Sequence, residues 1–288
     1  MQLSKDAVAL DVRDGTSWYI LGNAYLAQFF QCGQLSNVLK CSMNAYCKAG
    51  EDAKVESDPD YHYNRAIVYK YLDDYCNALL FFNNALEIQP QFPDCVRELG
   101  SLREQLLKTH SLIQSKGKFK VKKLNSLLKT LKEKSSRVTP TKLTLSSFND
   151  LSEGVNASTA IHCTLVSSVV PSVQTPFVAV CIDADLTCFA VNLYNIDSVK
   201  GPTVGDIITI PYPNKSTIDI TIEGQQLLFG LIRVESPLNV MVNGRQSSKV
   251  TVAPLQTALF WKILLSSVFF YLCCYNSLLC SISLTASF

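Results

Sequence analysis

The sequence predicts an α+β multidomain protein in which an α-solenoid of helical hairpins precedes a small C-terminal β-barrel. Three observations indicate this class. Apolar residues recur at helical spacing up to about residue 135, segments rich in Val, Ile, Thr and Phe begin near Lys142, and a lysine-rich stretch lies between them. The 288 residues suffice for about two domains, and a hydrophobic content of 48% excludes a chain that is disordered throughout.

A helical hairpin is repeated in the first segment. Trp18, Leu21, Gly22 and Tyr25 have the W-x2-L-G-x2-Y spacing of the first helix of a tetratricopeptide repeat (TPR). A second, more complete copy carries Ala66, Tyr69, Tyr75, Ala78, Phe82, Ala85 and the terminating Pro90. The alternative is an ordinary helical hairpin with chance alanines. We predict TPR repeats over residues 1–115, with a capping helix over 94–115.

The first copy is irregular. Its second helix carries Ser42, Tyr46 and Ala49, displaced by an insertion around residues 29–37. Residues 4–14 are expected to be the second helix of a preceding repeat whose partner is missing. We therefore expect an N-terminally truncated solenoid whose first helix exposes an apolar face.

A repeat stack presents a concave face lined by its first helices. Asparagine can both donate and accept hydrogen bonds, which suits the main chain of an extended peptide or nascent chain. The alternative is that the two asparagines expected on this face, Asn23 and Asn64, are solvated surface groups. The residues predicted there, at non-core positions, are Tyr19, Asn23, Tyr63, Asn64, Ile67 and Lys70.

Residues 116–140 are predicted to form a basic amphipathic helix and linker. Residues 103–137 carry a net charge of +9, although the whole chain carries only +2. Leu124, Leu128 and Leu131 recur with Val121 on one helical face. We predict contact with phosphate-rich RNA or DNA; the alternatives are a nuclear-import signal or a solubilising linker. The lysines concerned are Lys116, Lys118, Lys120, Lys122 and Lys123, and Lys129 and Lys132 are expected to be exposed beside them.

Residues 141–253 are predicted to form an OB-fold barrel, and an immunoglobulin-like sandwich is the rival. Strands are expected at 158–170, 177–182, 188–194, 206–211, 218–222 and 227–234, with hairpin turns at Glu223-Gly224 and Asn243-Gly244. Phe177, Phe189, Tyr194 and Tyr212 could stack on bases, but the core is the more frequent place for such residues. The net charge of −3 in this segment favours a protein partner, or contact with DNA only with help from the lysine run.

No catalytic or metal-binding pattern is found. The eleven cysteines form no CxxC pair, the three histidines are far apart, and GxSxG, P-loop and GxGxxG motifs are absent. Asp183 and Asp185 form a close carboxylate pair without a third ligand, which is typical of a turn. We therefore expect no enzyme activity, no cofactor, no metal, and reduced thiols in the nucleus or cytoplasm.

Several stretches resemble the tetratricopeptide repeat protein 5 family: WYILGNAY, SDPDYHYNRA, SKGKFKVKKL, YNIDSVKGPTVGDIITIP and MVNG. The resemblance covers about residues 1–250. It implies a TPR and OB-fold adaptor in the nucleus and cytoplasm. It further implies a cofactor of stress-activated, p53-type transcription that works with a histone acetyltransferase on chromatin. It also implies recognition of nascent tubulin at the ribosome, with Lys116 to Lys123 facing ribosomal RNA, and decay of tubulin mRNA.

The end of the chain, residues 254–288, departs from that family. The 26 residues after Lys262 carry no charge. By length they could form a tail-anchored membrane helix, which would make the chain a membrane-tethered TPR scaffold. Cys273 and Cys274 could then be palmitoylated. The reading that we favour is a read-through terminus.

Overall fold

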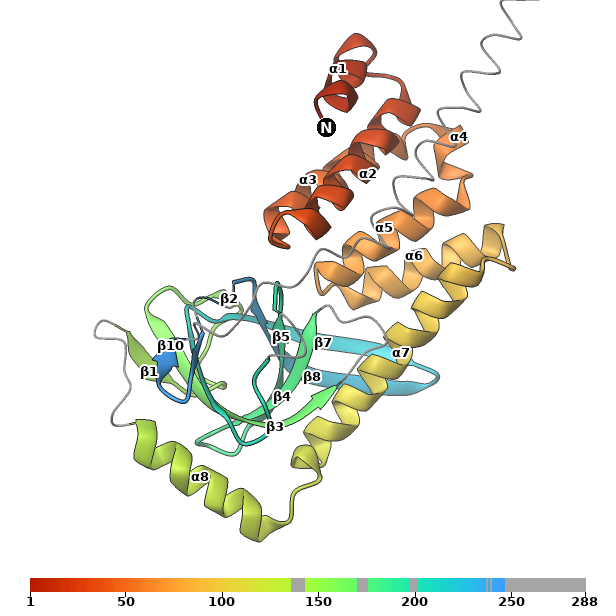
Figure 1. Ribbon diagram of the computed structural model, residues 1–288. Coiled ribbons are helices and arrows are strands. Elements are labelled where there is room, and N and C mark those ends of the chain that lie inside the picture. Colours follow the sequence, from red (N-terminus) through yellow and green to blue (C-terminus); the bar gives the residue numbers. More distant parts are fainter. Residues whose placement is uncertain (136–142, 170–175, 197–200, 237, 239, 247–288) are drawn as a thin grey trace, which may run out of the picture. The chain divides into compact units, whose positions relative to one another are not determined.

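The computed structural model describes residues 1–135, 143–169, 176–196, 201–236, 238 and 240–246. These residues divide after Val96 into two compact units, one of helices and one built around a β-barrel (Figure 1). The apolar tail at 254–288 lies outside the described residues. Within the described part of the chain, no helix combines the length and apolar character needed to cross a bilayer.

Unit 1 is helical. Aspartate begins four of its helices: the carboxylates of Asp14, Asp52, Asp58 and Asp74 accept hydrogen bonds from backbone N–H groups of the first turn. Its helices are α1 (Gln2–Leu10), α2 (Gly15–Gln31), α3 (Ser36–Ala49), α4 (Ala53–Glu56), α5 (Pro59–Tyr71), α6 (Tyr75–Ile88) and the start of α7 (Pro93–Gln114).

The first hairpin pairs α2 with α3 through a glycine. A Cβ placed on Gly22 would overlap the ring of Tyr46, so only glycine allows the two helices to come this close. Ser42 Oγ donates to the Gly22 carbonyl over 2.8 Å. Ser42, Tyr46 and Ala49 are all fully buried, which confirms the predicted inner face of α3.

The second hairpin, α5 with α6, has the regular TPR packing. Ala66, Ala78, Phe82 and Ala85 have no exposed surface, and α6 ends at Ile88, two residues before Pro90. Small residues at the crossing and one large aromatic between the helices are the arrangement that the sequence predicts.

Helix α1 packs on the first hairpin through Val8, its one buried residue, while Lys5 Nζ lies 5.8 Å from the Tyr25 ring centroid. Val8 packs with Leu21 and Ala45. In contrast, Leu3 is 84% exposed and Leu10 is 90% exposed. The prediction that the first helix exposes an apolar face is confirmed.

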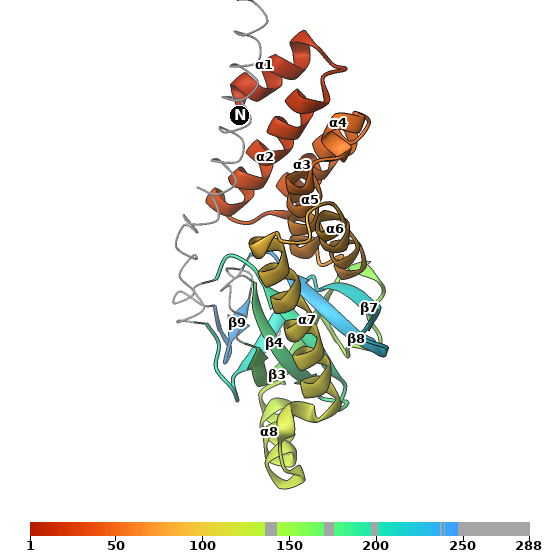
Figure 2. The ribbon, with the colours of Figure 1, turned by 90° about the vertical axis from the view of Figure 1, so that its right-hand side faces the viewer.

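Unit 2 begins inside α7, at Arg97, whereas the sequence suggested that the helical domain runs to residue 115. The reason is that α7 has apolar residues along its whole length: Leu102 and Leu106 are buried, and the His110 ring lies 6.4 Å from Phe229 of the barrel. The 3-10 turn η1 (Lys116–Lys118) and α8 (Val121–Ser135) follow α7. Figure 2 shows α7 and α8 beside the strands.

The six longest strands of the barrel match the predicted ones closely, whereas the four described strands of two or three residues were not predicted. Only β7 begins clearly earlier than predicted, at Asn214 instead of Ile218, because its first residues lack apolar alternation. The strands are β1 (Thr144–Ser146), β2 (Gly154–Val155), β3 (Thr159–Val169), β4 (Phe177–Asp183), β5 (Cys188–Leu193), β6 (Ile207–Pro211), β7 (Asn214–Ile222), β8 (Gln225–Val234), β9 (Met241–Val242) and β10 (Arg245–Gln246). Positive φ angles at Glu223-Gly224 and Asn243-Gly244 confirm both hairpin turns.

Strand pairing closes these strands into a ring. β3 pairs with β4, β4 with β5, and β5 runs parallel to β8. β8 pairs with β7, while β6 pairs with β3. Only Tyr212 and Pro213 separate β6 from β7, so one bent segment joins both ends of the sheet. This is the five-stranded OB-fold barrel that the sequence predicts, with β6 and β7 together acting as one bent strand.

An aromatic pair fills one end of the barrel core. The rings of Phe148 and Phe189 stack with their centroids 4.5 Å apart. Gly230 lies on β8, and a Cβ there would overlap the Phe148 ring. The absence of a side chain at Gly230 therefore leaves the space that this ring occupies.

We expect Gly22→Val to lower the free energy of unfolding of the repeat by about 1–3 kcal/mol, because the added side chain would overpack against Tyr46. Gly100→Ala is the matched control. No atom lies within 4 Å of a Cβ at Gly100, which is on the surface of α7. That change should raise stability by about 0.5–1 kcal/mol. Urea unfolding followed by circular dichroism measures both, and equal effects would contradict the packing.

The barrel should lose stability in mild acid because of His162. Burial lowers the pKa of this imidazole below its usual 6.5, and Thr209 Oγ1 lies 2.9 Å from its Nδ1. The unfolded chain therefore binds the proton more tightly than the folded chain does. The free energy of unfolding should have its full value above pH 6.5 and should fall as the pH drops below 6.5. Denaturant titrations at several pH values should show a smaller fall in His162→Gln. An identical fall in both proteins would refute this role.

Candidate binding sites on the repeat and the lysine segment

A buried polar network joins α2, α3 and α5. Asn23 Oδ1 on α2 accepts from the Tyr46 hydroxyl over 2.6 Å and from Asn64 Nδ2 over 3.2 Å. Asn64 Nδ2 also donates to the Tyr19 hydroxyl over 2.9 Å. The two asparagines that the sequence places on adjacent repeats are therefore brought together and hydrogen-bonded.

The prediction that the groove residues occupy non-core positions is wrong. Each of the six is at most 5% exposed: Tyr19, Asn23, Tyr63, Asn64, Ile67 and Lys70. For Asn23 and Asn64 the reason is the interhelical network, which uses their amides inside the hairpin stack. Their assignment to peptide contact stays a prediction.

Tyrosines surround this network. The Tyr19 ring centroid lies 6.0 Å from that of Tyr46 and 6.2 Å from that of Tyr61. Burial raises the pKa of Tyr19 and of Tyr46 far above the usual value, so both phenols stay neutral and can donate. A neutral, hydrogen-bonded interior of this kind holds the helices in register.

A cleft that the sequence did not indicate lies between α3, α5 and α6. Its volume is about 260 Å³ and its lining includes Cys47, Tyr61, His62, Arg65 and Phe81. The Arg65 guanidinium lies 4.3 Å from the Phe81 ring centroid and donates to the Tyr61 hydroxyl over 2.7 Å. Arginine stacked on an aromatic ring rigidifies the outer side of the hairpins.

The lysine segment is carried by an amphipathic helix. On α8, Leu124, Leu128 and Leu131 are buried, as predicted. Val121 is 72% exposed, so the expectation that it joins the apolar face is wrong: it is the first residue of α8. The outward lysines Lys122, Lys129 and Lys132 are all exposed.

The dense part of the run is held against the barrel at one glycine. Gly117 has φ of 70°, and a Cβ there would meet the Val166 carbonyl on β3. Lys118, Lys120, Lys122 and Lys123 are exposed around it, which gives a field that persists over about 8 Å at physiological salt.

Lys116 is different, because it is half-buried. Its charge acts on Cys188 of β5. Burial raises the pKa of the Cys188 thiol to about 11, and the nearby Lys116 charge opposes this rise. Four of the five predicted lysines are thus exposed toward solvent, one of them, Lys123, with its Nζ 5.2 Å from the Phe119 ring centroid, and the fifth is half-buried.

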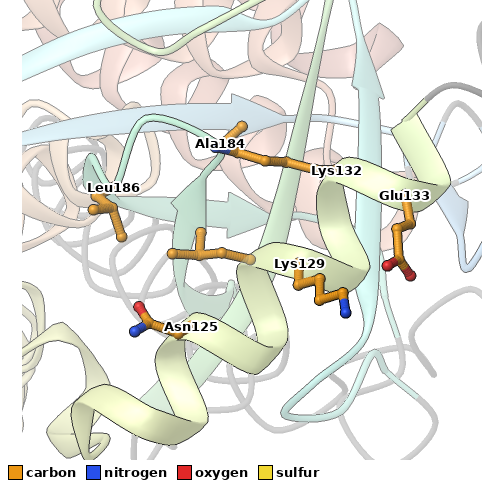
Figure 3. A pocket seen from close by; sticks show the side chains of 7 residues that line it. Asn125, Lys129, Lys132, Glu133, Ala184 and Leu186 are labelled. Atoms are coloured by element: carbon orange, nitrogen blue, oxygen red, sulfur yellow. The ribbon is translucent and has the colours of Figure 1, made fainter.

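A cavity of about 480 Å³ lies between α8 and the β4–β5 turn (Figure 3). Leu128, Ala184 and Leu186 supply apolar surface, and Lys129 and Lys132 stand on the helix side. Leu186 has φ of 66°, which is unusual for a bulky residue.

The barrel aromatics are mostly structural. Phe189 and Tyr194 are fully buried, Phe177 packs against the core, and Tyr212 is 52% exposed at the β6–β7 bend. Of the four predicted stacking residues, Tyr212 alone presents a largely accessible ring.

The carboxylate pair belongs to a turn, as the sequence predicts. Asp183 Oδ1 accepts from the N–H groups of Asp185 and Thr187. Across the described residues, no group of three metal-ligating side chains is assembled.

Comparison with known proteins places this architecture. Residues 142–256 match the family model described as tetratricopeptide repeat protein 5 OB fold domain. Tetratricopeptide repeat protein 5 of Mus musculus is 36% identical over 267 residues, which cover 88% of this chain and 61% of the relative. The Homo sapiens protein is 37% identical over 254 residues, covering 84% and 58%. The Bos taurus protein is 34% identical over 267 residues.

The chain is a homologue of tetratricopeptide repeat protein 5. It spans about three fifths of the length of these relatives. Homology to tetratricopeptide repeat protein 5 supports an architecture in which TPR helices precede an OB-fold domain.

We expect Asn23→Leu to lower the free energy of unfolding of the helical unit by about 1–3 kcal/mol, because the Tyr46 hydroxyl would lose its buried acceptor. Tyr46→Phe in the same background should recover part of the loss, since it removes the stranded hydroxyl. A double-mutant cycle from chemical denaturation measures the coupling. Strictly additive effects would contradict the hydrogen bond.

Proposed function

We propose that this chain is a TPR and OB-fold adaptor that holds an extended polypeptide on its helical repeat and contacts RNA through the lysine segment. The observation that carries the proposal is the exposed run from Lys118 to Lys123 on a scaffold packed against β3. Homology to an adaptor-type family supports the polypeptide partner.

The charge distribution favours RNA as the anionic partner of the lysine segment. Lys118, Lys120, Lys122 and Lys123 line neither the cleft between α3, α5 and α6 nor the cavity beside α8, so we expect them to contact phosphates without sequence preference. Each phosphate contact releases counterions, so binding should weaken steeply with salt. A ribosome offers a large phosphate surface next to an emerging chain, which fits both halves of the proposal.

The finer proposal follows the family resemblance. On this reading, the adaptor recognises nascent tubulin at the ribosome and promotes decay of tubulin mRNA, and it works in the cytoplasm. A second role in the nucleus is that of a coactivator in stress and p53-type transcription, in contact with a histone acetyltransferase and chromatin. Nuclear residence and capture of acetyltransferase activity would support this second role, and strictly cytoplasmic staining would oppose it.

The membrane-tethered scaffold is the weaker alternative. It depends on residues 254–288, which lie outside the described part of the chain. Retention of the chain in carbonate-washed membranes would support it, and release by the wash would reject it.

We expect Lys118→Glu, Lys120→Glu and Lys122→Glu together to lower ribosome cosedimentation by about tenfold or more, because three attractive phosphate contacts become repulsive. Lys40, Lys48 and Lys54 provide the matched control, since all three are exposed on unit 1. The same charge reversal there should leave cosedimentation near the wild-type level. Unchanged sedimentation of the first variant would remove the RNA-binding role.

A further inference from the structure

The hairpin formed by β7 and β8 leaves a strand edge open. β2 pairs with β7 only at Asn214 and Lys215 of β7. The pairing stops at Gly154, and Glu153, the residue before β2, is no longer paired with β7. From Ser216 to Ile222, β7 pairs with β8 on one side. On its other side, the described residues provide no strand for this stretch.

The hairpin turn decides which backbone groups face the open side. Glu223 and Gly224 have φ of 51° and 79°, so they form a two-residue turn flanked by the pair Ile222 and Gln225. In such a hairpin the flanking pair exchanges both hydrogen bonds, and every second residue along β7 does the same. The intervening residues Thr217, Asp219 and Thr221 therefore direct their N–H and C=O groups outward.

Neither β-ladders nor other backbone hydrogen bonds among the described residues use these outward groups. The side chains of the same three residues are exposed, whereas Ile218, Ile220 and Ile222 are buried. Seven residues of edge thus offer an accessible ladder, and an added strand gains main-chain hydrogen bonds there.

The charges along this edge are acidic. Glu153 accepts from the Thr217 hydroxyl over 2.7 Å, and Asp219 accepts from Gln226 over 2.8 Å. Glu223 is exposed at the tip. The neighbouring cation, Lys215, is turned away, since its Nζ donates to the carbonyls of Phe148 and Leu151.

We propose that the outer edge of β7, from Ser216 to Ile222, binds an extended lysine- or arginine-rich peptide as an added antiparallel strand. The partner's basic side chains lie on the outer face, opposite Asp219 and near Glu153 and Glu223. Its alternate, apolar side chains lie beside Ile218 and Ile220.

A second copy of this chain fits the same edge poorly. Antiparallel pairing of two β7 strands about their centre would bring two Asp219 carboxylates opposite one another, and like charges at such a position are destabilising. Nucleic acid is disfavoured as well, because its phosphates carry the same sign of charge as the carboxylates of this edge. The acidic edge also lies apart in the sequence from the lysine segment, so this site goes beyond the proposed adaptor function.

The test is fluorescence anisotropy of the full chain with a labelled, end-blocked heptapeptide of alternating Val and Lys. A second peptide with Glu in place of each Lys is the charge control. The basic peptide should bind saturably below about 1 mM, and the acidic one should bind at least about tenfold more weakly. Asp219→Lys should reverse this preference. Absence of saturable binding, or equal binding of both peptides by the wild type, would overturn the proposal.

The backbone contribution has its own pair of variants. Thr221→Pro removes an outward N–H that β8 does not use, and proline is tolerated on strand edges. Thr221→Pro should weaken binding of the basic peptide by about tenfold. Thr221→Ala keeps the N–H and should bind the peptide as the wild type does. Circular dichroism checks that both fold. Equal binding by the two variants, or a dimer in sedimentation velocity that Thr221→Pro abolishes, would overturn the assignment.

Discussion

The close approach of α2 and α3 at Gly22 is the constraint on which the helical unit depends. Because Gly22 has no side chain, the Tyr46 ring lies directly across α2 and its hydroxyl reaches Asn23. Asn23 accepts in turn from Asn64 on α5, so one missing side chain sets a run of hydrogen bonds that joins two repeats. Buried polar groups are costly unless they are paired, and here the pairing fixes the register of the stack. Any surface that the first helices present to a polypeptide inherits its shape from this network.

The barrel fixes the position of the lysine segment, as the network around Gly22 fixes the helices. Gly117 adopts a left-handed conformation against Val166, and the apolar face of α8 is buried, so the charged side chains project from an ordered support. A charged run on a fixed support loses less conformational freedom on binding than a free tail would. The fold therefore combines a hydrogen-bonded helical stack with a positively charged surface on the barrel unit, the two features on which the proposed function rests.

Much of this fold could be predicted from the sequence, because periodicity and turn chemistry are local signals. The spacing around Trp18 identifies the repeat, and alternation of β-branched residues places five of the six expected strands to within two residues. The short strands β1, β2, β9 and β10 are too brief to show such alternation. What could not be predicted depends on packing between distant segments. Asn23 and Asn64 have the polarity of surface residues, but the network buries them. The bend at Tyr212 that joins β6 to β7 has no apolar signal of its own, and helix α7 has one continuous pattern across both units.

The most direct test of the central claim is protein–RNA crosslinking of the full chain on ribosomes, with the crosslinked residues identified by mass spectrometry. The account predicts RNA crosslinks concentrated between Lys118 and Lys132, on the exposed side of η1 and α8, and crosslinks to an emerging polypeptide on the helical unit. RNA crosslinks spread over α1 to α6, with none in the lysine segment, would contradict it.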